Sequence, residues 1–100
     1  MNPNTIELLE TFNSEIKILE ISGKKINGEL NLNKFAFLEE LDCNFNSINT
    51  ITKLPNTITR LNCSLNKLTS LENLLKECVN LKFLNFSFTI SLIASLSVVI

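Results

Sequence analysis

The sequence predicts a solenoid of the α/β class, in which about four short coils stack side by side and share one parallel β-sheet. Segments that start near residues 16, 38, 58 and 81 align without gaps, so the repeat length is 20–23 residues. Each segment carries apolar residues at alternate positions, as a strand with one buried face requires. The 100 residues also include 18 Leu and 15 Asn but only 2 Gly and 2 Pro, a bias that indicates internal repeats.

The overall composition indicates one folded domain and excludes several functions. With 45% hydrophobic residues, 19% charged residues and a net charge of −1, the chain is too apolar to be disordered. Nine basic residues are balanced by ten acidic ones, so the charge gives no reason to bind nucleic acid. The absence of His removes His-based acid–base catalysis and the commonest metal ligand.

Residues 1–15 are expected to form a helix that caps the first coil. Asn4 is a suitable N-cap and Glu7 follows three residues later, which is a capping-box spacing. One face of this helix carries the apolar residues Ile6, Leu9 and Phe12. That face would cover the otherwise open edge of the first coil.

The repeats occupy residues 16–91, and the two middle copies are the most regular. Segments 38–48 and 58–68 each follow the order Leu/Ile-x-x-Leu-x-Cys-x-x-Asn-x-Leu/Ile. The second Leu and the Cys alternate with polar residues, so both side chains face the same side of a strand. Asn46 and Asn66 follow the strands, where an amide can satisfy backbone groups of the turn that would otherwise be buried without partners.

This LxxLxCxxNxL pattern resembles the leucine-rich repeat, whose period is about 20–29 residues. The outer copies depart from it at the Asn position, which holds Lys24 and Thr89, and the last copy departs also at Ser91. Lys24 and Thr89 are expected to satisfy the backbone groups of the turn less well than Asn does. This is acceptable in the first and last coils, which have only one neighbouring coil. The resemblance implies a parallel sheet on the concave side, and a concave surface that binds proteins or peptides.

The connections between the strands are expected to differ, so that the convex side mixes helical and extended chain. Residues 68–81 predict a helix with Ser70 as its N-cap. Its apolar positions have helical spacing and are Leu71, Leu74, Leu75 and Cys78. Residues 48–58 contain Leu54-Pro55, which predicts an extended segment. Residues 28–30, Gly-Glu-Leu, resemble a turn that is common in leucine-rich repeats.

The three cysteines, Cys43, Cys63 and Cys78, are too few and odd in number for a disulfide-stapled domain. Cys43 and Cys63 occupy the same inward position of adjacent strands, about 5 Å apart across the ladder. They could form a disulfide or redox pair, but free Cys is among the most buried residue types, which favours two small core residues. No Cys/His cluster has metal-ligand spacing, so neither a metal nor a cofactor is expected.

The outward residues of the strands form the candidate partner-binding surface on the concave face. They are Glu20, Glu40, Asp42, Asn44, Arg60, Asn62, Phe83 and Asn85. The acidic end, near Glu20, Glu40 and Asp42, would suit a basic segment of a protein or peptide. The alternative is a solvated polar face on which Glu40 and Arg60 form a weak cross-strand pair. No catalytic residues are assigned, because exposed carboxylates lack the burial that a general acid needs.

Residues 83–100 form a tail without any charged side chain. Its 18 residues just reach the length of a membrane-spanning helix, about 17–25 residues. The first of these residues already belong to the last repeat, and Asn85 and several serines oppose insertion. The alternatives are a helix near residues 90–100 that packs on the last coil through Leu92, Ile93, Leu96 and Val99 or Ile100, or a longer repeat array.

The sequence therefore predicts a non-enzymatic, cytoplasmic protein–protein interaction module. One alternative is a substrate-recruiting fragment of a larger assembly, such as a ubiquitin-ligase adaptor or a kinase-linked repeat array. Another is an interaction protein anchored in a membrane by residues 83–100. Because one repeat fold serves many functions, all three remain expectations that rest on analogy.

Overall fold

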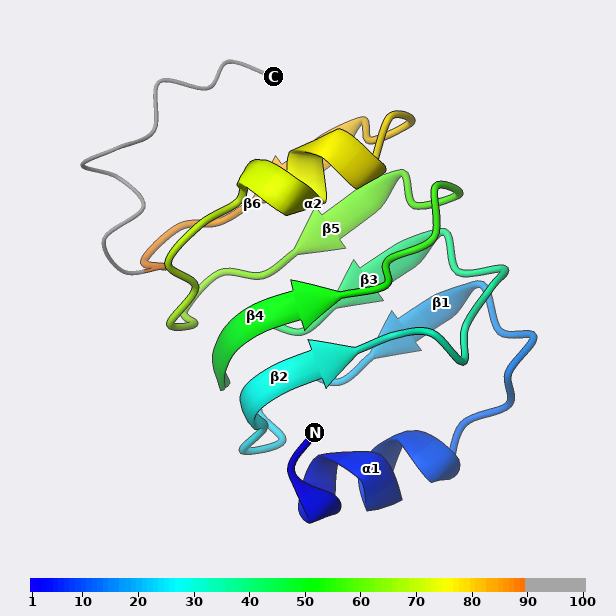
Figure 1. The fold of residues 1–100 in the computed structure, drawn as a ribbon, viewed down its shortest axis with the longest axis vertical. Helices are drawn as coiled ribbons and strands as arrows, with labels where there is room; N and C mark the ends of the chain where they lie inside the picture. Colours follow the sequence, from blue (N-terminus) through cyan, green and yellow to red (C-terminus); the bar gives the residue numbers. More distant parts are fainter. Residues whose placement is uncertain (90–100) are drawn as a thin grey trace.

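Four short parallel strands form the main sheet. In the computed structural model, which describes residues 1–89, they are β1 (Ile18–Glu20), β3 (Glu40–Asp42), β5 (Arg60–Asn62) and β6 (Phe83–Asn85), side by side in that order. Each connection leaves the sheet and returns to start the next strand in the same direction (Figure 1). The prediction of a parallel-sheet solenoid is confirmed; the chain makes about three turns, and the expectation of four coils is not confirmed.

The register of this sheet is the one that the repeat alignment predicts. Leu19 pairs with Leu41, Leu41 with Leu61, and Leu61 with Leu84. The first three of these side chains are buried and the fourth is partly buried against the same core. The inward row of leucines is therefore one continuous apolar layer, as expected for stacked coils.

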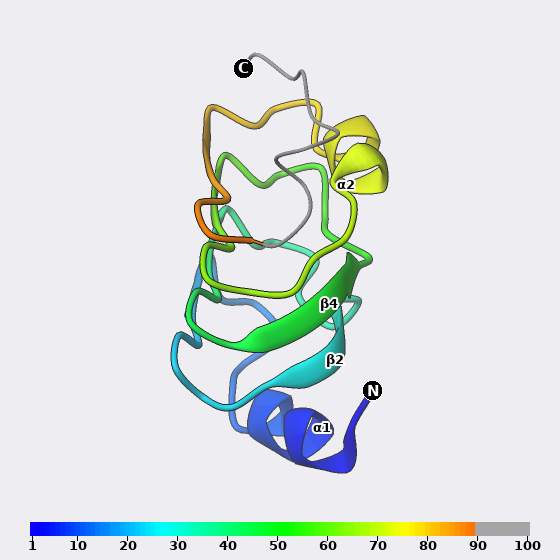
Figure 2. The same ribbon diagram turned by 90° about the vertical axis from the view of Figure 1, so that its left-hand side faces the viewer.

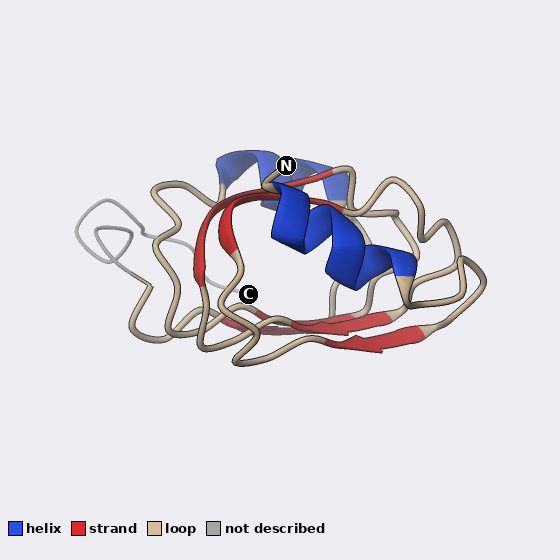
Figure 3. Ribbon diagram, turned by 90° about the horizontal axis from the view of Figure 1, so that it is seen from below, coloured by secondary structure: helices blue, strands red, loops and turns tan. Residues whose placement is uncertain are grey.

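A second sheet closes the other side of the solenoid. It consists of β2 (Asn27–Asn31) and β4 (Ser47–Thr52), which pair in parallel. Viewed along the stack, the two sheets lie on opposite sides of the interior (Figure 3). The extended conformation expected after residue 48 is confirmed, whereas the turn expected at residues 28–30 is wrong. Those residues lie in β2, where Gly28 has a φ of +83° at a shift in register, so the glycine serves a β-bulge.

The helix α1 (Pro3–Glu10) lies across one end of the stack (Figures 1 and 2). Its N-cap is Asn2 rather than the expected Asn4, because the Asn2 side chain accepts a hydrogen bond from the Asn4 backbone at 3.0 Å. The expected inward face is confirmed at Leu9, which is buried, and at Phe12, which is partly buried against the core; it is wrong at Ile6, which is exposed, and Thr5 is buried instead. Ile6 lies about 100° around the helix from Thr5, since an α-helix has 3.6 residues per turn.

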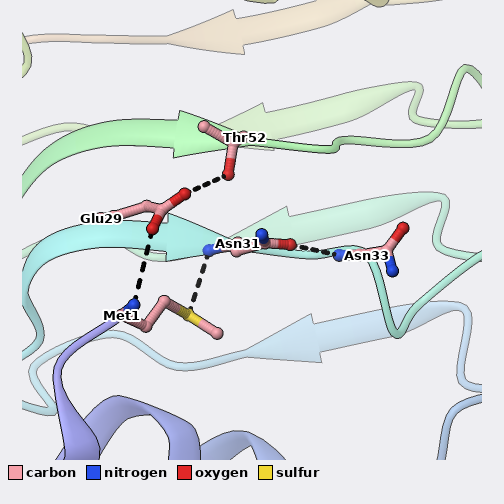
Figure 4. A network of polar contacts seen from close by, with 5 residues as sticks. All are labelled: Met1, Glu29, Asn31, Asn33 and Thr52. Carbon is pink, nitrogen blue, oxygen red and sulfur yellow. Dashed lines mark hydrogen bonds and ion pairs between the residues drawn. The ribbon is translucent and has the colours of Figure 1, made fainter.

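Polar contacts join the start of the chain to the second sheet (Figure 4). The Met1 ammonium group lies 3.6 Å from Glu29 Oε1, and Thr52 Oγ1 donates to Glu29 Oε2 at 2.9 Å. The Asn31 backbone N–H points to the Met1 sulfur at 3.2 Å. The segment before α1 is therefore attached to β2, and Glu29 of β2 also bonds to Thr52 of β4.

The helix α2 (Glu72–Glu77) lies in the last connection and is shorter than the predicted 68–81. Its N-cap is Leu71 rather than the predicted Ser70, and the Leu71 side chain makes no capping hydrogen bond. Ser70 lies one residue earlier, and its Oγ accepts from the Glu72 backbone N–H at 3.1 Å. The helical periodicity is confirmed for Leu71, Leu74 and Cys78, which are buried, and Leu75 is partly buried.

The interior is filled by aliphatic side chains and one large aromatic side chain, Phe35. Phe35 lies between β2 and β3 and is fully buried. No helix among residues 1–89 is both long enough and apolar enough to cross a membrane. The tail hypotheses concern mainly residues 90–100, which lie outside the described residues.

Candidate functional site

The outward residues of the four strands lie in two ladders on one face of the main sheet. Pairing across the strands places Glu20, Asp42, Asn62 and Asn85 in one column, and Ile18, Glu40, Arg60 and Phe83 in the next. All eight side chains are exposed or half-buried. The structure thus brings seven of the eight candidate binding residues, all but Asn44, into one continuous strand face.

Asn44 lies just beyond β3 and is half-buried. Its carbonyl oxygen accepts from the Gly23 backbone at 3.0 Å and from Asn46 Nδ2 at 3.1 Å. In the next coil the equivalent residue, Ser64, is buried. This row therefore holds the turns together and contributes less to the face than the sequence suggests.

The side chains of the first column also stabilise the turns that follow the strands. Each directs a side-chain oxygen to the backbone N–H two residues later, from Glu20 to Ser22 at 2.8 Å and from Asn62 to Ser64 at 3.2 Å. The same contact joins Asp42 to Asn44 and Asn85 to Ser87. One oxygen of each side chain is therefore engaged in a turn.

The acidic end of the face contains two interacting carboxyl groups with opposite pKa shifts. Burial raises the pKa of Asp42 above its ordinary value of 3.8, and the neighbouring carboxylate of Glu20 adds to this rise. Hydrogen bonds from the Ser22 hydroxyl and backbone lower the pKa of Glu20 below 4.5. The two groups lie on adjacent strands, so a cation placed between them would relieve their mutual repulsion.

Arg60 connects this acidic end with an aromatic surface. Its Nε lies 3.4 Å from Glu40 Oε1, which confirms the predicted cross-strand pair. Its guanidinium carbon lies 4.2 Å from the ring centre of Phe83, in the geometry of a cation–π contact. The arginine is thus held between the carboxylate of β3 and the ring of β6.

A hollow of about 270 Å³ lies in the strand face. Its lining residues come from all four strands and are Ile18, Leu19, Glu20, Glu40, Leu41, Asp42, Arg60, Asn62 and Phe83. Acidic, basic, amide and apolar groups therefore converge on one depression, which is the strongest candidate for a binding site on this face.

The cysteines lie outside this surface. All three are free and buried, so the prediction that Cys43 and Cys63 are core residues is confirmed. Burial raises the pKa of Cys63 to about 12 and that of Cys78 to about 11, and it also raises the pKa of Cys43 well above 9. Because the thiolate is the reactive form, these thiols are poor nucleophiles near neutral pH. Within residues 1–89, no group of three or more His, Cys, Asp or Glu side chains could hold a metal ion.

One row of exposed apolar residues was missed in the sequence. Phe45, Leu65 and Phe88 immediately precede Asn46, Asn66 and Thr89, and all three are exposed. The repeat alignment contains the signal, because the same position is apolar in three successive copies. The inward alternation does not predict this row, since the three residues lie between the inward strand positions and the turn residues that the repeat explains.

The fold and the strand face define the protein as a parallel β-solenoid with a polar sheet surface. No family model matches the chain, and neither curated proteins nor solved structures give a significant match.

Proposed function

We propose that this chain is a leucine-rich repeat domain that binds an extended peptide or protein segment on its strand face, without catalysing a reaction. The repeat pattern supports the family assignment, together with the coil-to-coil contacts of Asn46 and Asn66. Asn66 Nδ2 donates to the carbonyl of Cys43 in the preceding coil at 2.9 Å, and Asn46 Nδ2 reaches that of Ile21 at 3.1 Å. The amide is therefore used as the repeat pattern requires.

The observation that carries the binding proposal is the hollow between Ile18, Glu40, Asp42 and Phe83. Its carboxylates favour a Lys or Arg side chain of the partner, because opposite charges attract strongly where water is partly excluded. The ring of Phe83, 40% exposed, offers an apolar contact at the other end. We therefore propose a partner segment that carries a basic residue followed or preceded by an apolar one.

Three features distinguish this proposal from an enzymatic function. The thiols are buried and protonated, the carboxyl groups of the face are partly solvated, and the chain has no His. A substrate-recruiting role within a larger assembly would use the same surface. The two roles differ only in whether the domain works alone or within a larger assembly. Identification of the segment that binds the strand face therefore tests both.

Selection of displayed random peptides on the immobilised protein tests the proposal. Enriched peptides should contain Lys or Arg near an apolar residue, and fluorescence anisotropy should show weaker binding to Asp42→Asn and Phe83→Ala, by about tenfold each. Glu15→Gln is the matched control, because Glu15 is an exposed carboxylate outside the sheet. Peptides that bind Asp42→Asn and Phe83→Ala as tightly as the wild type would contradict the proposal.

A further inference from the structure

A row of large apolar side chains runs along the edge of the solenoid where the chain leaves the main sheet. We name Phe45, Leu65 and Phe88 the edge row; their exposed fractions are 70%, 42% and 74%. The three residues are neighbours across coils, since the Phe45 N–H donates to Ser64 O at 3.0 Å and the Leu65 N–H to Ser87 O at 2.8 Å. The turns that contain them follow β3, β5 and β6 on the same side of the stack (Figure 1).

The backbone at the edge row is unfavourable for the residues that occupy it. Phe45, Leu65 and Phe88 have φ values of +58°, +54° and +57°, in the left-handed region. Gly23 holds the equivalent position of the first coil at +62° and needs no side chain there. Glycine would suit all four turns, and large exposed side chains add little to the core. Bulky, exposed apolar residues in this strained conformation therefore point to a role outside folding.

The surroundings of the edge row are basic. The equivalent turn segments 22–27, 44–49, 64–69 and 87–89 contain three lysines and no acidic residue. These lysines are Lys24, Lys25 and Lys67; all are exposed, and among the described residues none of them forms an ion pair. The charge of Lys24 also helps to lower the pKa of Glu20 on the neighbouring strand face.

A hollow lies beside the edge row, next to Gly23. Its volume is about 580 Å³, and it is lined by Gly23, Lys25, Asn27, Phe45, Asn46 and Ser47. A negatively charged group in this hollow would meet the Lys25 ammonium group and the ring of Phe45 together. The edge thus combines projecting apolar side chains with room for an anion.

No charged residue follows Phe88 in the sequence. The described chain reaches Thr89 directly after Phe88, and residues 90–100 read Ile-Ser-Leu-Ile-Ala-Ser-Leu-Ser-Val-Val-Ile. An acidic protein partner would use the lysines but would give no reason for the large apolar side chains that project from the edge row. An anionic lipid surface suits both features, because it attracts lysines and accepts apolar side chains at the headgroup boundary.

We propose that the edge row and its lysines dock the protein on the surface of an anionic lipid bilayer. Phe45, Leu65 and Phe88 enter the interface between headgroups and acyl chains, while Lys24, Lys25 and Lys67 contact the headgroups. This docking surface is separate from the strand face, so it does not depend on the proposed peptide binding. A docked molecule keeps the strand face available for a partner.

Co-sedimentation of the full chain with lipid vesicles tests this proposal. We expect binding to phosphatidylcholine vesicles that contain phosphatidylserine, and weaker binding as salt is added. Phe45→Gly with Phe88→Gly should reduce the fraction bound at least tenfold, because both rings are lost from the interface. Lys24→Glu with Lys25→Glu should reduce it by a similar factor, because charge attraction becomes repulsion.

The glycine variants separate docking from folding. Glycine suits the positive φ at both positions, so the melting temperature should stay the same or rise while vesicle binding is lost. Phe37→Ser is the matched control, because Phe37 is 56% exposed but lies in the connection between β2 and β3. It should bind vesicles as the wild type does.

Three results would overturn the proposal. The first is equal binding to vesicles of phosphatidylcholine alone. The second is unchanged binding of the double glycine variant, because membrane contact would then belong to residues outside the edge row. The third is binding of a polyglutamate peptide without binding of anionic vesicles, which would assign the edge to acidic polypeptides. Failure of peptide selection on the strand face would leave these measurements unaffected, so the two proposals can fail separately.

Discussion

The side-chain nitrogen of Asn66 donates to the carbonyl oxygen of Cys43 in the preceding coil, at 2.9 Å. The amide oxygen of the same Asn66 accepts from the Ile48 backbone at 3.0 Å, so one buried side chain supplies both a donor and an acceptor to that coil. Thr89, at the equivalent position of the last coil, is also buried and donates to Cys63 O at 2.9 Å. Contrary to expectation, threonine therefore retains the coil-to-coil donor bond.

Replacement of Asn66 by Ala should lower the free energy of unfolding by about 2–4 kcal/mol, because it leaves a buried N–H and buried carbonyl groups without partners. Urea denaturation measures this change. Asn49→Ala is the matched control, since Asn49 is exposed on β4, and it should change stability by less than about 0.5 kcal/mol. Equal effects of the two substitutions would refute a structural role of the amide.

Asp42→Asn should stabilise the protein at neutral pH by less than about 1 kcal/mol, because it removes a partly buried charge beside Glu20. The raised pKa of Asp42 means that the folded state binds this proton more tightly than the unfolded state. The contribution of protonated Asp42 to the free energy of unfolding is fully present below pH 3.8 and is lost as the pH rises through the raised pKa.

The increase in the free energy of unfolding that Asp42→Asn causes should therefore be absent near pH 3 and grow toward pH 7. The lowered pKa of Glu20 acts in the opposite direction, with stability present above pH 4.5 and lost as the pH falls through the lowered value. Urea denaturation of both proteins across this range measures the difference. A gain that is constant with pH would contradict the assigned pKa shift.

Phe35→Ala should destabilise the protein by about 3–5 kcal/mol, because it removes the largest fully buried side chain of the core. Phe37→Ala, two residues further along, should change stability by less than about 0.5 kcal/mol, since that ring is mostly exposed. Thermal unfolding followed by circular dichroism compares the two. Similar melting temperatures would disprove the inward orientation of Phe35.

The contact of α1 with the core can be tested by another matched pair. Leu9→Ala should cost about 2–4 kcal/mol because Leu9 is buried against the core, whereas Ile6→Ala should cost little because Ile6 is 42% exposed. Both substitutions keep good helix formers, so the difference reports packing rather than helix propensity. Similar costs of the two substitutions would favour the inward face expected from the sequence, which contains both Leu9 and Ile6.

The three thiols should not react with an aromatic disulfide reagent at pH 8 while the protein is folded, and all should react after denaturation. Their burial and raised pKa values both oppose formation of the thiolate. Absorbance of the released thiol follows the reaction. Fast reaction of native Cys43 or Cys63 would contradict their placement in the core.

The repeat pattern alone was sufficient to predict the main sheet. The alternation at Leu41 and Cys43, repeated at Leu61 and Cys63, determines which side chains face inward, because the period of a strand is two residues. The columns of the strand face follow from the same alignment. The conserved spacing within the chain likewise predicts that Asn46 and Asn66 occupy equivalent turns.

The sequence was less informative where one residue can adopt several conformations. Gly28 suggested a turn, but its positive φ serves a bulge within β2, since β4 supplies a partner strand there. On α1 the inward position was misjudged only at Ile6, because Thr5, one residue and about 100° away around the helix, faces the core instead. The local sequence determines neither the conformation at Gly28 nor the inward residue of α1. Both depend on which part of the folded chain packs against them.

The sequence by itself determined the stacking of coils, the inward leucines and the turn amides, since these follow from a short-range pattern that recurs. The tertiary structure decided the second sheet, the position of Phe35 and the alignment of Phe45, Leu65 and Phe88 into one exposed row. Residues about 20 positions apart become neighbours only when the coils close on one another. The physical reason is that periodicity specifies which way a side chain points, while packing between coils specifies what it meets.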